Sequence, residues 1–422
     1  MTATADQAPH EAPDQAPPAA PPRRSRGRRL LDLYLYGNVV VVTLLAFLCA
    51  LVVGAVLIVV ADEATRASFG YFFSAPGDTV SNAWSAVSSG YGALFRGAIV
   101  DPGTVGNGPT AAFGPLSNTL LNAAPLILGG LAVAVAFRTG LFNIGVQGQL
   151  IMGAVAAGYV AFSWSMPPVI GVLVSLVAGM LGGALWGGLA GWLKARTGAH
   201  EVITTIMLNY VALYLLSYLL GVRGFQAPGS NQAISRRPLE NNRLPHLFGS
   251  GLSVHVGLVI ALLAALGTWW LLDRSSLGFR LKAVGANPFA ARTAGMGVER
   301  SYTTVMLISG ALAGLVGCSQ ILGTNPALTG DIDAGLGFEA ITVALLGGAT
   351  PGGTVLAGLL FGAFRAGSVV MNTATSIPPE VVSVIEPVMV LFIAAPALIR
   401  AVFRLRASRG GGVGQLAKGW NG

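Results

Sequence analysis

The sequence has little charge. Only 10% of its 422 residues are Asp, Glu, Lys or Arg, whereas 53% are hydrophobic. A soluble globular domain carries about 25% charged residues, so this chain has too little charge to cover a surface that faces water. Its mean hydropathy is +0.68, and its 58 glycines follow no collagen-like period. Frequent glycine within apolar runs is typical of helices that pack closely in lipid.

Residues that carry common catalytic and metal chemistry are also scarce. The two cysteines, Cys49 and Cys318, lie in apolar runs and form no C-x-x-C pair, which argues against a disulfide scaffold or a zinc site. None of the three lysines stands in the G-K-[ST] string of a Walker A motif. His200-Glu201 lacks the second His of H-E-x-x-H, and no G-x-S-x-G elbow carries a plausible nucleophile. We therefore expect no catalytic residue, no metal and no cofactor of its own.

The net charge of +8 does not indicate nucleic acid. The basic residues cluster beside apolar segments and are not interleaved with aromatic residues, as they are in single-strand-binding proteins. Orientation in a membrane explains the charge, so we expect no nucleic-acid partner.

Three regions follow from composition. Residues 1–37 form a basic, Pro-rich head that we expect to be disordered and cytoplasmic. Residues 38–400 contain the apolar runs and form the transmembrane domain, and residues 401–422 form a Gly-rich, basic cytoplasmic tail. The first apolar run exceeds the ~20 residues needed to cross a bilayer, and it is longer than the core of a signal peptide. We interpret it as a retained span.

The apolar runs predict an all-α, polytopic bundle of about ten transmembrane helices. They are Val39–Val60, Leu116–Phe137, Phe142–Phe162, Val169–Leu193, Val202–Leu220, Val254–Leu272, Tyr302–Leu322, Phe338–Gly348, Thr354–Met371 and Val381–Ile399. The eighth run is too short to cross a bilayer alone and precedes Pro351-Gly352-Gly353, so we expect a broken helix inside the bundle.

Loop charges set the expected orientation. With the N-terminus inside, 18 Lys and Arg residues lie on the cytoplasmic side, six lie outside, and Arg365 lies within a span. The positive-inside rule therefore places both termini in the cytoplasm. Spans two to five and seven to ten then form two blocks of opposite orientation, whose second helices open with the related strings Gly140–Gly145 and Gly337–Thr342. This pattern predicts inverted repeats, which build transport sites at their interface.

The most informative soluble segment is cytoplasmic, around Asn287–Gly295. Asn suits a helix N-cap, Pro the first helical position and Gly the position after the end. The segment predicts a helix of about two turns, roughly 10 Å long. The local signals alone leave two interpretations open. The segment is either a docking helix, whose small alanine side chains let another protein approach closely, or an ordinary connecting turn.

Four strings carry a resemblance to a known family. They are Phe137–Gln149 (FRTGLFNIGVQGQ), Glu201–Tyr210 (EVITTIMLNY), Gly278–Gly297 (GFRLKAVGANPFAARTAGMG) and Gly337–Gly347 (GFEAITVALLG). Together they resemble ABC importer permeases of the branched-chain amino acid, ribose and nucleoside superfamily, most of all its nucleoside and simple-sugar branch. The resemblance covers about residues 31–404.

The resemblance implies a multi-pass permease in the cytoplasmic membrane and a division of labour. Two permease subunits form the pathway, an ATPase subunit binds and hydrolyses ATP below, and an external solute-binding protein delivers solute. The long outer segment 61–115 is similar to that of the longer permease of nucleoside-type pairs, so a different, shorter permease is implied as partner. By resemblance, a coupling helix would dock on the ATPase through Asn287, Pro288, Ala290, Ala291, Arg292 and Gly295.

Polar residues within spans are candidates for the substrate pathway. We select Asn143, Gln147, Asn209 and Glu339, because amides and a carboxylate supply the donors and acceptors that a ribose or base needs. Hydrogen bonds between helices are the alternative role. Arg365 and Glu386 lie at similar depth in consecutive antiparallel helices, so we expect them to pair, with Glu339 as the alternative partner.

The sequence thus predicts a permease subunit, without its own ATP site, of an importer for nucleosides or simple sugars. A stand-alone secondary transporter or facilitator is the alternative function. It would also show inverted repeats and a broken helix, but it would not need a capped cytoplasmic helix. The residues do not separate nucleosides from sugars.

Overall fold

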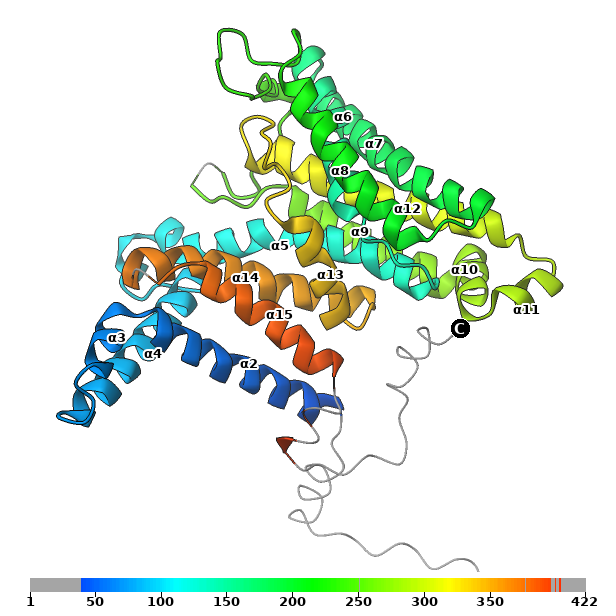
Figure 1. Ribbon diagram of the computed structural model, residues 1–422. Helices are drawn as coiled ribbons and strands as arrows, with labels where there is room; N and C mark the ends of the chain where they lie inside the picture. Colours follow the sequence, from blue (N-terminus) through cyan, green and yellow to red (C-terminus); the bar gives the residue numbers. More distant parts are fainter. Residues whose placement is uncertain (1–38, 250, 376, 396–398, 400–401, 404–422) are drawn as a thin grey trace, which may run out of the picture.

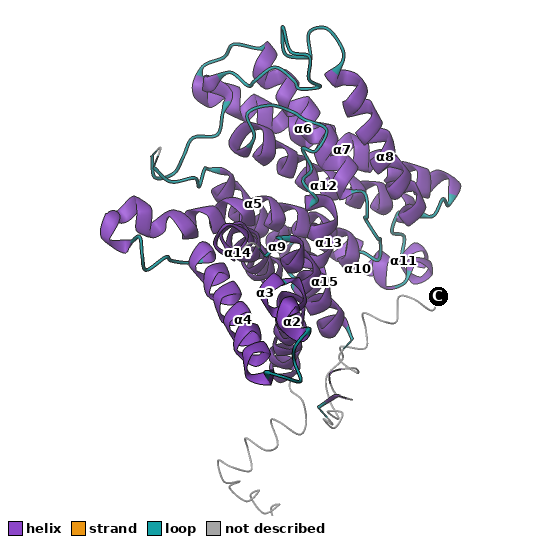
Figure 2. Ribbon diagram, turned by 60° about the vertical axis from the view of Figure 1, so that its left-hand side comes forward, coloured by secondary structure: helices purple, strands orange, loops and turns teal. Residues whose placement is uncertain are grey.

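The computed structural model describes residues 39–403 apart from 250, 376, 396–398, 400 and 401. The expected head, residues 1–37, and most of the expected tail therefore lie outside the described residues. Helices and loops make up the described chain, and no strand longer than an isolated bridge occurs in it (Figure 2). The predicted all-α membrane bundle is confirmed.

Eight of the described helices are long and apolar enough to cross a membrane. They are α2 (Val39–Ala61), α5 (Pro109–Arg138), α6 (Val146–Ser163), α7 (Pro168–Thr197), α8 (Glu201–Leu220), α9 (Gly257–Arg274), α12 (Val298–Ser319, extended by the π turn Gln320–Thr324) and α14 (Pro351–Thr375). The two remaining expected runs form the shorter helices α13 (Leu336–Leu346) and α15 (Glu380–Ala394). The count of ten is thus approximate, and α13 is the short helix that the sequence predicts.

The two four-helix blocks pack across each other. Helix α5, the first of one block, lies along α14, the third of the other, and α12 correspondingly lies along α7 (Figure 1). The second helices repeat the exchange, since α6 packs on α12 and α13 packs on α5. The contacts are therefore symmetric. The first helix of each block packs on the third helix of the other block, and the second helix of each packs on the first helix of the other. This is the arrangement expected of inverted repeats.

Glycine makes the contact between α7 and α12 very close. A Cβ on Gly183 would lie 2.3 Å from the carbonyl oxygen of Gly310, and one on Gly314 would lie 2.2 Å from that of Gly179. Side chains at these positions would force the two backbones apart. In lipid, the hydrophobic effect does not drive helices together, because the acyl chains are as apolar as the side chains. Helices therefore associate through close packing at small residues. The high glycine content therefore has a structural role here.

The outer segment 61–115 contains two helices that the apolar runs do not reveal, α3 (Glu63–Phe69) and α4 (Pro76–Ala98). The Asp62 side chain caps α3 by accepting a hydrogen bond from the Thr65 amide at 2.8 Å. Helix α4 packs on α14 and α2, and the Tyr91 hydroxyl donates to the Leu51 carbonyl in α2. The hairpin projects sideways from the end of α2 (Figure 1).

At the opposite end, two short helices join α9 to α12. Helix α10 (Ser276–Ala286) packs on α9, and α11 (Pro288–Thr293) packs on α10 (Figure 1). They lie at the same end of the bundle as Arg138 and Lys194, which stand in the last turns of α5 and α7. This end therefore carries the basic residues that the sequence assigns to the cytoplasm.

Candidate functional site

The second helices of the two repeats, α6 and α13, meet at their N-terminal ends. A Cβ on Gly337, in the first turn of α13, would lie 2.5 Å from the Cβ of Gln147 in the first turn of α6. The Gln147 side chain donates from Nε2 to the Asp333 carboxylate at 2.9 Å. Since α6 and α13 are the second helices of the two repeats, this contact joins the repeats at corresponding positions. Gln147 therefore links the repeats, and the candidate pathway runs beside it.

Asn143 and Asn209 hold the irregular backbone before α6. The amide of Asn143 is fully buried and donates from Nδ2 to Gln149 Oε1 at 2.9 Å and to Ser309 Oγ of α12 at 2.7 Å. Asn209, on α8, accepts from the Gly148 amide at 2.8 Å and donates to the Ile144 carbonyl at 3.0 Å. Both amides satisfy groups of their own chain, as the alternative role predicts. Their hydrogen bonds fix the position at which α6 begins.

Arg365 pairs with Glu339 and not with Glu386. The Arg365 guanidinium of α14 lies 3.1 Å from Glu339 Oε2 of α13, and its second terminal nitrogen donates to the Ala334 carbonyl at 2.7 Å. The expected Arg365–Glu386 pair is absent from the ion pairs of the described residues. Helix α15, which carries Glu386, packs mainly on α2 and only lightly on α14. The consecutive helices α14 and α15 are therefore not close neighbours, and Arg365 pairs with the alternative partner, Glu339.

A polar cavity of about 160 Å³ opens between the two repeats. Its walls come from α5, the π turn after α12, the loop before α13, and α14. The lining residues are Leu121, Asn122, Pro125, Gln320, Thr324, Asn325, Asp331, Ala334, Leu336 and Arg365. Of the selected pathway residues, none lines this cavity. Glu339 pairs with the lining residue Arg365, and Gln147 donates to Asp333, which is next to the lining residue Ala334 in the chain.

The sequence analysis did not select Gln320, Asn325, Asp331 and Asp333 of this region. Asn325, Asp331 and Asp333 stand in a loop, outside every apolar run, and Gln320 stands at the end of one. A usable signal does exist, because two aspartates directly precede the broken helix. Irregular backbone at membrane depth is tolerated only inside protein or beside a cavity, so polar residues next to a break are candidates as well.

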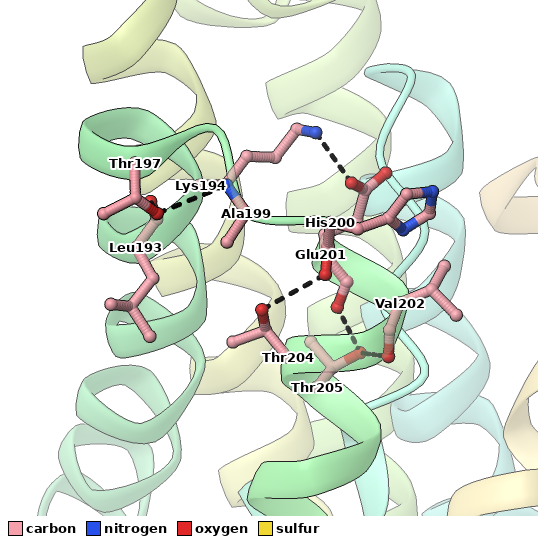
Figure 3. Close-up of polar contacts among 9 residues, drawn as sticks. All are labelled: Leu193, Lys194, Thr197, Ala199, His200, Glu201, Val202, Thr204 and Thr205. Carbon is pink, nitrogen blue, oxygen red and sulfur yellow. Dashed lines mark hydrogen bonds and ion pairs between the residues drawn. The ribbon is translucent and has the colours of Figure 1, made fainter.

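A half-buried ion pair ties the end of α7 to the start of α8. Lys194 Nζ lies 2.7 Å from Glu201 Oε2 (Figure 3), and the ammonium also lies 5.5 Å from the centre of the Tyr302 ring on α12. Thr205 donates its hydroxyl to the Glu201 carbonyl at 2.7 Å. Three helices thus converge on one charge pair at this end, and the pair closes the turn between α7 and α8.

Helix α11 has the predicted caps. The Asn287 side chain accepts from the amides of Phe289 and Ala290 at 3.0 Å each, Pro288 follows at the first position, and Gly295 has φ +79°. Ala290 is exposed, but Ala291 is buried against Val284 and Val298 of its own chain. The expectation that both alanines face a partner is therefore corrected, since α11 needs one face to pack on α10 and α12.

The large apolar side chain that α11 exposes is Phe289, which is 81% exposed. Arg292 is also exposed and pairs with Glu299 in the first turn of α12. An exposed phenylalanine on a short, well-capped helix offers a compact apolar contact. The sequence analysis passed over this residue because hydropathy alone does not distinguish an outward aromatic from a buried one.

Comparisons with known proteins agree with this architecture. Residues 116–394 match the family described as branched-chain amino acid transport system / permease component. The chain is 39% identical to the guanosine ABC transporter permease protein NupP of Bacillus subtilis, over 75% of this chain and 88% of NupP. It is 38% identical to the glucose ABC transporter permease protein TsgB13 of Haloferax volcanii, over 67% and 77%.

A more distant relative is the guanosine ABC transporter permease protein NupQ, also of Bacillus subtilis, which is 27% identical over 58% of this chain and 78% of NupQ. No solved structure matches the chain. The family match covers the bundle from α5 to α15, including both repeats, the cavity and α11. The chain belongs to the permease component family of branched-chain amino acid-type transport systems, and it is a multi-pass ABC transporter permease.

Proposed function

We propose that this chain is one of two permease subunits of an ATP-driven importer that carries nucleosides or simple sugars into the cell. The names of NupP and TsgB13 supply the two solute classes, and the identities of 39% and 38% do not separate them. The observation that carries the proposal is the polar cavity between the two inverted repeats. Inverted-repeat transporters bind their solutes at such interfaces, beside discontinuous helices.

A second, different permease is the proposed partner within the membrane. Bacillus subtilis has two guanosine ABC transporter permease proteins, and this chain is much more similar to NupP than to NupQ. We infer that this chain takes the NupP-like place and that a NupQ-like subunit takes the other. An external solute-binding protein would deliver the solute on the side that carries the cavity.

A separate ATPase is the proposed energy source. The sequence has no Walker A string, so ATP must be bound elsewhere if transport is driven by ATP. Helix α11 is the proposed docking element, through Asn287, Pro288, Ala290 and Arg292, with Gly295 ending the helix. Its caps fix its conformation before docking, and its exposed Phe289 fits a groove in a partner.

The proposed location is the cytoplasmic membrane, with both termini in the cytoplasm. The charge distribution supports this orientation, because 18 of the 25 Lys and Arg residues then lie inside. In this orientation α11 faces the cytoplasm, where ATP is available, and the loop 325–335, which supplies part of the cavity wall, lies toward the outside. The two proposed partners therefore approach from opposite sides of the membrane.

Uptake with and without the ATPase tests the proposal. Cells that express this permease with its partner subunits should accumulate radiolabelled guanosine or glucose, and deletion of the ATPase should abolish the accumulation. Uptake at the full rate without an ATPase would identify a facilitator. Failure to take up any nucleoside or sugar with all partners present would reject the proposed solute class.

A further inference from the structure

The cavity contains one free carboxylate. Asp331 is exposed at the cavity wall, and its side chain takes part in no hydrogen bond or ion pair of the described residues. Its neighbour Asp333 is different, because that carboxylate accepts from Gln147 at 2.9 Å. An ionised carboxylate offers two oxygens that accept hydrogen bonds and none that donates. Asp331 can therefore accept hydrogen bonds from a bound ligand.

The one cation of the cavity is already engaged. Arg365 donates to Glu339 at 3.1 Å through one terminal nitrogen and to the Ala334 carbonyl at 2.7 Å through the other. A guanidinium recognises phosphate or carboxylate best when both terminal nitrogens face the anion. Here each terminal nitrogen already donates one hydrogen bond to the protein, and the Glu339 carboxylate offsets the charge of Arg365, so that Asp331 leaves the site with a net negative charge. The cavity is thus electrostatically unfavourable for an anion.

Amides and apolar side chains complete the lining. Gln320 is 6% exposed, and its Oε1 accepts from Asn325 Nδ2 at 2.8 Å, while its own Nε2 donates to no residue in the described chain. Asn122 donates to the Asn118 carbonyl at 2.8 Å, so its Oδ1 stays available. The apolar side chains are those of Leu121, Pro125 and Leu336. A few polar groups that converge over apolar side chains are characteristic of small-molecule sites.

We propose that this cavity binds a neutral sugar ring and that Asp331 is a specificity-determining residue, accepting hydrogen bonds from two adjacent ring hydroxyls. The proposal rests on the proposed function and deepens it. A vicinal diol presents two donors side by side, which match the two oxygens of a carboxylate. Guanosine and glucose share this group, so one acceptor serves both solute classes named for the relatives. The volume of about 160 Å³ is below the ~300–1,000 Å³ of sites for larger ligands, so it suits one ring.

The cavity also selects against phosphorylated solutes. A phosphate would face Asp331, while the lining cation Arg365 is already paired with Glu339, and like charges at close range repel. The sugar ring of a nucleotide would therefore bind less well than that of the nucleoside, although both carry the same diol. The site should therefore discriminate in two ways: against solutes that lack the diol, and against solutes that carry a phosphate.

Cysteine protection tests the site without the binding protein, whose own selectivity would otherwise obscure the result. Thr324 is exposed in the cavity wall, so Thr324→Cys should react with a membrane-impermeant thiol reagent added outside. The described native cysteines are buried or half-buried, and the unmodified chain gives the background. Guanosine should slow the reaction, whereas 2′,3′-dideoxyguanosine and guanosine 5′-monophosphate should not. For the sugar class, glucose is compared with 1,5-anhydro-3-deoxyglucitol, a pyranose ring that has no two adjacent hydroxyls.

The Asp331→Asn change should abolish protection by guanosine or glucose at concentrations up to about ten times those that protect the unmodified site, because a site built to hydrogen-bond a hydroxyl loses much of its affinity when one side of that bond is removed. Glu240→Gln, which removes an exposed carboxylate from the outer loop, should leave protection unchanged. Asn122→Leu provides a second cavity variant and should weaken protection in the same direction.

Two results would overturn the proposal. Equal protection by guanosine and its dideoxy analogue, or protection that survives Asp331→Asn, would show that no diol is bound by this carboxylate. Parallel uptake measurements separate this failure from a failure of the proposed function. Guanosine or glucose uptake without any protection at Thr324→Cys would reject the proposed binding site but leave the proposed importer function intact. Absence of uptake with all partners present would reject both.

Discussion

Arg365 is the residue at which the loss of a single charge should be most informative. Its guanidinium lies between α13 and α14 and pairs with Glu339. A charge left unpaired within the membrane costs ~3 kcal/mol. Arg365→Gln and Glu339→Gln should each lower the yield of folded permease in detergent, and the double variant should recover part of that loss, because it removes both charges together.

Glu386 provides the matched control for this pair. It is buried on α15 and forms no ion pair with Arg365 within the described residues. Combining Glu386→Gln with Arg365→Gln should therefore rescue nothing. If that combination recovers as much yield as the combination with Glu339→Gln, then Arg365 is shared between the two carboxylates and the assignment of its partner is wrong.

His255 should make stability depend on pH. It lies in the outer loop before α9, where burial, with a smaller effect of His246, lowers its pKa to about 4. The unfolded chain binds a proton below pH ~6.5, so the folded state binds fewer protons between pH ~6.5 and 4. Unfolding free energy should thus fall as the pH drops through this range, by up to about 3 kcal/mol.

Melting curves of the purified permease between pH 4 and pH 7 would measure this effect. The Nδ1 atom of His255 accepts from the Gly257 amide at 3.0 Å, and an Asn side chain can replace that acceptor without titrating. His255→Asn should flatten the profile, whereas His200→Asn, at an exposed position directly before α8, should not. An unchanged slope in His255→Asn would assign the pH dependence to other groups.

Which polar residues matter was only partly readable from the sequence. Asn143 and Asn209 stood out because amides are rare in apolar runs, but their role depends on partners that the fold supplies. Ser309, which accepts from Asn143, is 166 residues away along the chain. Conversely, Asp331 lay outside the apolar runs that directed the search. Sequence patterns report local environment, whereas a cavity is made by residues that are distant in sequence.

Among the elements, apolar length located the spans well and missed the outer hairpin. The expected run 169–193 corresponds to α7 (Pro168–Thr197), and the expected run 202–220 to α8 (Glu201–Leu220). Helix α4 escaped because serines and glycines interrupt its apolar residues, so that no long apolar run forms. The caps of α11 were predicted correctly, since Asn, Pro and Gly act through local backbone geometry.

Helix α11 offers a test in which neighbouring residues should behave differently. Phe289→Ala and Ala290→Glu change exposed side chains, so the permease should accumulate and melt like the unmodified chain while binding of the ATPase and uptake decline. Ala291→Glu places a charge in an interior cluster of its own chain, which costs several kcal/mol. That variant should instead lose stability. Melting temperature and co-purification of the ATPase separate the two effects.

Phe248→Ala is the matched control for Phe289→Ala. Phe248 is 68% exposed in the outer loop, and so its removal tests the loss of an exposed aromatic on the opposite side of the membrane. ATPase binding should be normal in this variant. If Phe289→Ala also binds the ATPase normally, α11 is a connecting turn and the ATPase docks elsewhere.

On the scale of the whole molecule, contacts connect α11 to the start of α8 and to the first turn of α6. Arg292 of α11 pairs with Glu299 of α12, and one turn further Tyr302 lies against Lys194, which holds Glu201 at the start of α8. From α8, Asn209 reaches the first turn of α6. Rigid helices joined in this way can transmit a movement of α11 toward the broken helices, as rocking of one repeat against the other requires.

Such transmission presupposes the proposed orientation, which thiol labelling can test. The head and tail positions Ser25 and Ser408 lie outside the described residues. Ser235, the natural choice in the outer loop, is 1% exposed, and its amide donates to the Leu328 carbonyl at 3.0 Å. Asn231 and Ala294 are exposed on the outer loop and beside α11, respectively, and they form a better pair of probes.

In intact cells an impermeant thiol reagent should label Asn231→Cys and leave Ala294→Cys unlabelled until the membrane is permeabilised. Ser25→Cys and Ser408→Cys should behave like Ala294→Cys, because the positive-inside rule places all three in the cytoplasm. Background should be low, since Cys318 is buried and Cys49 is half-buried. Labelling of Ala294→Cys in sealed cells would place α11 outside, where it meets no ATP, and would leave the cavity facing the cytoplasm. An importer driven from inside could not work in that orientation.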